Sequence, residues 1–153
     1  MLKNAVVFGA ASALITGIAI GIQGYFSGKA GSLIGPVNTG FWTNFLGGML
    51  AGLLILVLSL FVGPQFKTIS RPAFIMNLVS GALGIIIIMG ISFSISRAGM
   101  AAGLAAVIFG QFIFGVIADS VGLGGIQRIP LDLQRIIGLA LMAFSVFLLL
   151  PKK

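Results

Sequence analysis

The residues that could carry chemistry are few, because the chain of 153 residues has two acidic and nine basic side chains and no histidine or cysteine. Without histidine or cysteine it cannot form a typical zinc site, a disulfide, a redox thiol or a histidine-activated nucleophile. The two acids, Asp119 and Asp132, do not form a pair inside an apolar segment. The sequence therefore predicts no catalytic site, no metal site and no cofactor.

The side chains that could bind a solute are amides within apolar segments, together with one tryptophan. An amide surrounded by hydrocarbon needs a hydrogen-bond partner or water, so these side chains are expected to point into a helix bundle or a wet cavity. The candidates for a solute pathway are Gln23, Trp42, Asn44, Asn77 and Gln111. Hydrogen bonding between helices without any ligand explains the same residues, and the sequence leaves both interpretations open.

Two stripes run along the first apolar segment. A polar line, at spacings of four, seven and four residues, consists of Ser12, Thr16, Gln23 and Ser27. A glycine face lies one residue further round the helix, and such faces let helices approach closely. The predicted helix-packing positions are Gly17, Gly21 and Gly24 in this segment, Gly48 and Gly52 in the second, and Gly103 and Gly110 in the fourth.

The two acids have expected structural roles near the ends of apolar segments. Asp132 precedes the last segment, where an acid caps a helix or interacts favourably with its dipole. Asp119 is expected to pair with Arg128 or Arg135. Since neither carboxylate lies at mid-membrane, the sequence argues against a proton-coupled exporter of cations, which needs an acid in its cavity.

The elements that must position these residues are membrane-spanning helices. Apolar residues make up 59% of the chain and charged residues only 7%, whereas a soluble domain has about a quarter charged residues. Runs of about 20 apolar residues, interrupted by charged and turn residues, predict an all-α fold with five transmembrane helices in a single domain of residues 1–153. The predicted helices cover residues 5–26, 37–62, 72–96, 100–118 and 131–150.

The basic residues divide almost evenly between the two faces of such a bundle. Five spans place the termini on opposite sides, with Lys3, Lys67, Arg71, Arg128 and Arg135 on the N-terminal face and Lys29, Arg97, Lys152 and Lys153 on the other. This small difference barely specifies an orientation. Three interpretations stay open: insertion in both orientations with antiparallel pairing, insertion in one orientation with a different partner, and a parallel oligomer. The net charge of +7 fits residues flanking the membrane rather than a nucleic-acid site.

Several motifs of the C-terminal half carry a family resemblance, namely Gly110-Gln111, Ile117-Ala118-Asp119, Gly122-Leu123, Arg128-Ile129-Pro130-Leu131 and Arg135-Ile136-Ile137-Gly138-Leu139. With them the chain resembles the small five-helix YdcZ-type family of bacterial inner-membrane proteins, in the drug/metabolite transporter superfamily. Gln23, Gly35-Pro36 and the run Phe45-Leu46-Gly47-Gly48 extend the similarity to the N-terminal half. Two sites depart from the family pattern: Ser27-Gly28 where an asparagine is expected, and Ser120 where a histidine is expected.

The resemblance implies a unit that matches one half of the larger ten-helix transporters, whose halves are inverted relative to each other. Two copies of the chain would rebuild that arrangement, which is the usual frame for alternating access around a midplane site. The leading prediction is therefore a bacterial inner-membrane carrier for a small organic solute. It would work as an antiparallel homodimer, or paired with a five-helix homologue. The alternative is a membrane interaction or accessory protein that transports nothing.

Overall fold

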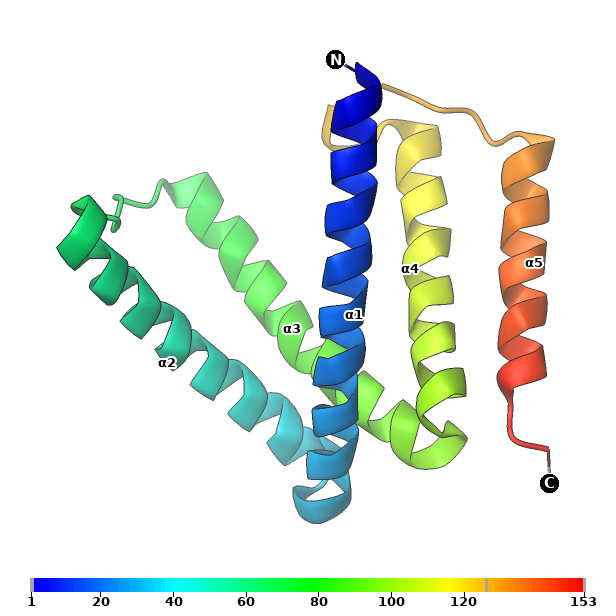
Figure 1. Ribbon diagram of the computed structural model, residues 1–153, viewed down its shortest axis with the longest axis horizontal. Helices are drawn as coiled ribbons and strands as arrows, with labels where there is room; N and C mark the ends of the chain where they lie inside the picture. The colour runs from blue at the N-terminus through cyan, green and yellow to red at the C-terminus, as the bar shows by residue number, and fades with distance from the viewer. Residues whose placement is uncertain (1, 126, 153) are drawn as a thin grey trace. The chain divides into compact units, whose positions relative to one another are not determined.

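The computed structural model describes residues 2–125 and 127–152, with side chains from Val6 onward, so the side chains of Lys3 and Lys153 in the charge comparison lie outside it. The described chain is all-helical, as predicted. Its elements are α1 (Leu2–Ile34), α2 (Pro36–Val62), α3 (Arg71–Ala98), α4 (Met100–Val121), the short 3-10 turn η1 (Leu123–Gly125) and α5 (Leu133–Leu149) (Figure 1).

Four of these helices, α1 to α4, are long and apolar enough to cross a membrane. They have between 22 and 29 residues within the apolar spans, whereas α5 is apolar but has only 17 residues. At about 1.5 Å per residue, α5 is about 25 Å long, slightly less than the hydrocarbon core of a typical bilayer. Four spans are thus supported, and the fifth stays a prediction.

Most helix ends differ by a few residues from the predicted ranges, and three of them have a clear local cause. The first predicted helix ended at residue 26, but α1 continues to Ile34, because Lys29 is compatible with a helix and the chain turns only at Gly35. At the end of α4, the left-handed Gly122 donates its backbone N–H to the carbonyl oxygens of Ala118 and Asp119 and stops the helix at Val121 rather than at 118. The last helix begins at Leu133 because Asp132 is its N-cap.

Two helix pairs are joined by a single glycine in nearly the same conformation. Gly35 links α1 to α2 with φ 80° and ψ 156°, and Gly99 links α3 to α4 with φ 81° and ψ 168°. This combination of angles is essentially confined to glycine. Each glycine donates its N–H to the residue four positions before it and accepts from the residue four positions after it, at 3.0–3.1 Å. The joints therefore leave neither the N–H nor the C=O group of these glycines unpaired.

The helices form two compact units. The first contains the described residues up to Tyr25 and those from Ser94 onward, and the second contains Phe26–Phe93. In the first unit, α4 packs against α5 (Figure 1). It also lines a pocket together with α1. In the second unit, α2 approaches α3 closely at Gly40, where an added Cβ would lie 2.6 Å from Met89 Cγ and 3.1 Å from the Ile85 carbonyl oxygen.

Ser92 is a fully buried polar residue of the second unit. It is 0% exposed, it lies against Gly31, and its hydroxyl has no hydrogen-bond partner among the described residues. A buried hydroxyl without a partner costs about 1–3 kcal/mol. Thr39, also buried, avoids this cost because its hydroxyl donates to the Gly35 carbonyl at 2.9 Å.

The Ser92→Ala variant is therefore expected to be more stable than the native chain, by about 1 kcal/mol. The denaturation midpoint of the detergent-solubilised protein measures this. Ser145→Ala is the control, since the exposed Ser145 hydroxyl already donates to the Leu141 carbonyl at 2.9 Å, and its substitution should change stability little. A less stable Ser92→Ala protein would contradict the prediction.

Candidate functional site

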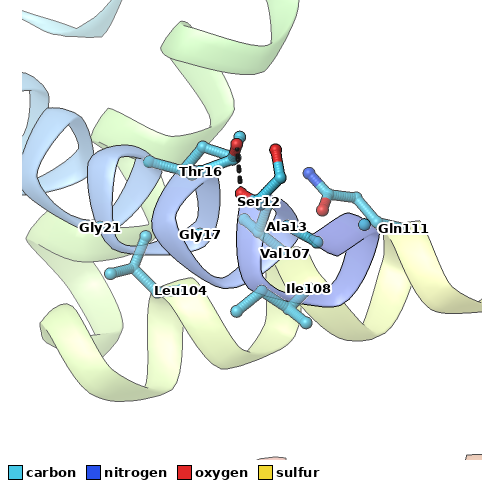
Figure 2. Close-up of a pocket in the computed structure, with 11 residues that line it drawn as sticks. Ser12, Ala13, Thr16, Gly17, Gly21, Leu104, Val107, Ile108 and Gln111 are labelled. Carbon is cyan, nitrogen blue, oxygen red and sulfur yellow. Dashed lines mark hydrogen bonds between the residues drawn. The ribbon is translucent and has the colours of Figure 1, made fainter. Parts of the chain in front are cut away.

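A pocket of about 560 Å³ lies between α1 and α4 within the first unit. Its lining comes from Gly9, Ser12, Ala13, Thr16, Gly17, Ile20 and Gly21 of α1 and from Leu104, Val107, Ile108 and Gln111 of α4 (Figure 2). Two of the predicted packing glycines help to make the space, because no neighbouring atom lies within 4 Å of where a Cβ of Gly17 or Gly21 would be. In this unit these two glycines line the pocket, and their predicted role in helix packing stays a prediction.

The polar lining of this pocket consists of Ser12, Thr16 and Gln111. In Figure 2 these three side chains follow one another along one edge of the pocket, and Leu104 and Ile108 lie along the other. The Thr16 hydroxyl donates to the Ser12 carbonyl at 2.9 Å, so it still has lone pairs to accept a hydrogen bond. The pocket can therefore receive a molecule with a polar side and an apolar side.

Only part of the predicted polar line takes part. Ser12 and Thr16 line the pocket, whereas Gln23 lies further along α1 and is exposed, and Ser27 is buried in the other unit. Ser12 and Thr16 were not among the predicted solute contacts, although their spacing had placed them on the same line as Gln23. Hydroxyls on a helix are commonly satisfied by the preceding turn, as Thr16 is, and this makes their further role hard to recognise from sequence.

A separate hollow of about 460 Å³ in the second unit brings together two of the predicted amides. It is lined by Asn44, Asn77, Leu78, Gly81, Ala82 and Ile85. The amide nitrogen of Asn44 donates to Gly40 and that of Asn77 to Ala73, both at 2.8 Å. Each NH₂ group thus has one hydrogen bond to its own helix. The side-chain oxygens of the two asparagines can accept further hydrogen bonds.

Trp42 is not part of the lining of any of these hollows. It packs edge-on against Phe41, with ring centroids 5.2 Å apart, and against Phe45 at 6.0 Å. Phe41 and Phe45 are stacked at 5.7 Å. All three rings are about half exposed, so they form an aromatic surface on α2.

At the end of α4, a smaller hollow of about 260 Å³ is lined by Gln111, Phe112, Gly115, Val116, Asp119 and Arg135. Asp119 accepts from the Arg135 guanidinium at 3.0 Å, which confirms the predicted ion pair and selects Arg135 over Arg128. The Asp132 carboxylate accepts from the Arg135 backbone N–H at 2.9 Å, which confirms the predicted helix cap. Gln111 lines both this hollow and the larger pocket of the same unit.

The other predicted packing glycines differ in their surroundings. An added Cβ at Gly103 would lie 3.2 Å from the backbone nitrogen of Ile95, so α3 and α4 are close at this point. Gly24 is buried. No neighbouring atom lies within 4 Å of a Cβ at Gly48, Gly52 or Gly110. A packing role for these three positions stays a prediction, and it would require contacts beyond those described within the chain.

Long apolar helices joined by short turns define a polytopic helical membrane protein. The chain belongs to the family described as "Putative inner membrane exporter, YdcZ", whose model matches residues 8–148. This confirms the family resemblance seen in the sequence. No curated protein and no solved structure gives a significant match. The chain is accordingly a multi-pass protein of the inner membrane.

Proposed function

We propose that this chain is a carrier that moves a small organic solute across the inner membrane by alternating access. The observation that carries the proposal is the pocket between α1 and α4, which combines a polar edge with apolar walls and has room for a small molecule. Membership of a family described as an exporter supports it independently. It also fits the expectation that the chain is not an enzyme.

In this proposal, different residues of the pocket contact different parts of the solute. Ser12, Thr16 and Gln111 exchange hydrogen bonds with the polar group of the solute, and Leu104 and Ile108 contact its apolar part. Gln23, Asn44, Asn77 and Trp42 are proposed to line other parts of the pathway. The acceptor oxygens of Asn44 and Asn77 suit a solute with N–H or O–H donors.

The working form is proposed to be an inverted pair of chains, each a single transmembrane domain of five spans with α5 as the fifth. The length of α5 supports this, because a helix of 17 residues falls within the range that crosses a thin or locally thinned bilayer. The near-even division of basic residues supports insertion in both orientations. The open faces at Gly48, Gly52 and Gly110 offer smooth surfaces to a second copy or to a five-helix homologue.

Transport is tested with purified protein and a panel of small organic solutes. A transported solute is expected to raise the thermal midpoint of the protein and to move across proteoliposomes that contain it. Heat-inactivated protein reconstituted at the same density is the control. A broad panel that produces neither effect would contradict the carrier and favour the alternative of an accessory membrane protein.

Dual insertion predicts that any single position is found on both sides of the membrane. The natural chain has no cysteine, so Lys29→Cys and Lys67→Cys each introduce one thiol, in regions that five spans place on opposite faces. In intact cells, an impermeant thiol reagent is expected to label a fraction of each variant, and the rest only after permeabilisation. Labelling of one variant alone from outside would contradict the inverted homodimer and leave a heterologous partner or a parallel oligomer.

A further inference from the structure

The ion pair at the end of α4 leaves part of the Arg135 guanidinium without a partner. Nη2 of Arg135 donates to Asp119 Oδ2 at 3.0 Å, and the Arg135 backbone N–H donates to Asp132. The other terminal nitrogen, Nη1, is buried and has no hydrogen-bond partner among the described residues. A second acceptor is therefore missing at a charged group that needs one.

The missing acceptor is most suitably an oxyanion. A buried donor without a partner is costly, and more so when it belongs to a charged group. The planar guanidinium presents its donors in a fork that matches a carboxylate or a phosphate, which no neutral group matches as well. The hollow of about 260 Å³ that Arg135 lines has room for such a group.

The position of this hollow connects it with the pocket between α1 and α4. Gln111, Gly115 and Asp119 recur at four-residue intervals and share one side of α4. Gln111 lines both the pocket and the smaller hollow. A molecule that is hydrogen-bonded to the Gln111 amide therefore lies next to the hollow that Arg135 lines. An anionic lipid head group has the same chemistry, but a lipid would not need this continuity with the polar pocket.

We infer that Arg135 binds the carboxylate of the transported solute, which makes small organic acids the substrate class. This inference rests on the proposed carrier function and narrows it. Asp119 opposes the binding, because its carboxylate repels an incoming anion and occupies one of the guanidinium nitrogens. Asp132 holds the backbone of Arg135 through the helix cap and leaves the guanidinium untouched. The ion pair is thus both a structural contact and the resting form of the binding site.

The test measures binding of benzoate and acetate to the purified protein in detergent. The readout is the rise in the thermal midpoint at constant ionic strength, with chloride as the reference anion. Arg135→Gln is expected to weaken benzoate binding by about tenfold or more, since a charge-assisted hydrogen bond is lost. Asp119→Asn is expected to strengthen it, because the competitor is removed. Arg128→Gln is the matched control, as Arg128 lies exposed in the loop and lines none of the described hollows, and it should bind benzoate as the native chain does.

Because Arg135→Gln breaks an ion pair, Arg135→Lys is measured with it, and the helical content of each variant is checked by circular dichroism. Lysine keeps the charge and the pair with Asp119 but loses the fork, so intermediate binding is expected. Equal loss in Arg128→Gln, or unchanged binding in Arg135→Gln, would overturn the inference. The carrier itself would still stand if an uncharged solute crossed proteoliposomes in a Gln111-dependent way.

A lipid source is distinguished by vesicles of phosphatidylcholine with and without phosphatidylglycerol. The inference expects Arg135-dependent benzoate binding in both compositions. If the Arg135-dependent stabilisation came only from phosphatidylglycerol and benzoate had no effect, the oxyanion would be a lipid phosphate, and the assignment to the solute would be wrong.

Discussion

Replacing Gln111 by leucine is expected to reduce solute transport in proteoliposomes by about tenfold or more. Among the described residues, Gln111 alone lines both the larger pocket and the smaller hollow of the first unit, and it brings an amide donor and acceptor to otherwise largely apolar walls of α4. Loss of a hydrogen bond to a bound solute costs at least about 1.4 kcal/mol where the solute group is left unpaired, which corresponds to a factor of ten. Leucine has a similar volume and suits a helix, so the fold should be kept.

Gln134→Leu is the matched control for this experiment. Gln134 lies exposed in the first turn of α5 and lines none of the described hollows, so its replacement makes the same chemical change outside the proposed site. Transport should then stay within about twofold of the native chain, as for a surface substitution that costs under 0.5 kcal/mol. Equal transport by Gln111→Leu and the native chain would exclude this pocket from the solute pathway.

Replacing Gly40 by leucine is expected to lower the free energy of unfolding by about 3 kcal/mol, at the upper end of overpacking effects. Even an added Cβ would lie 2.6 Å from Met89 Cγ and 3.1 Å from the Ile85 carbonyl oxygen. Met89 can change its rotamer, but the backbone of α3 can move only with the helix. The change should lower the denaturation midpoint in detergent and loosen α2 from α3.

Gly47→Leu provides the comparison within the same helix. Gly47 lies seven residues after Gly40, on nearly the same side of α2, and no neighbouring atom lies within 4 Å of its Cβ position. Its substitution is expected to leave stability unchanged or slightly improved, because glycine is a poor helix former. If the two variants were equally stable, the contact of α2 with α3 at Gly40 would not be present in the protein.

The features that sequence predicted well are those set by local geometry or by the membrane. Asp132 caps α5 because a carboxylate just before a helix meets the N–H three residues later, which follows from spacing alone. The long apolar runs became helices because a chain in hydrocarbon must satisfy its backbone internally. Sequence narrowed the ion-pair partner of Asp119 to Arg128 or Arg135, because both follow the end of α4 closely, but it could not choose between them.

The features that sequence could not predict depend on how helices cross. Gly40, Gly48 and Gly52 were expected to share one face of α2. Of these three, only Gly40 lies against another helix within the second unit. Gly31 meets Ser92, a contact between residues 61 positions apart, and no local pattern marks it. Likewise the polar line of α1 gave no sign that Ser12 and Thr16, rather than Gln23, would lie opposite Gln111. Which residues of a stripe meet a neighbour depends on the crossing point, and small residues permit many such points.

The one-residue joints at Gly35 and Gly99 have a consequence for biogenesis. A linker of one residue is too short for the first helix of a pair to enter the lipid alone while the second is still being synthesised. Each pair is therefore expected to enter the lipid together, with the N–H and C=O groups of the joining glycine already hydrogen-bonded within the chain. A substitution with a side chain at either glycine would then act during synthesis, by lowering the yield of inserted protein, before any effect on the mature molecule.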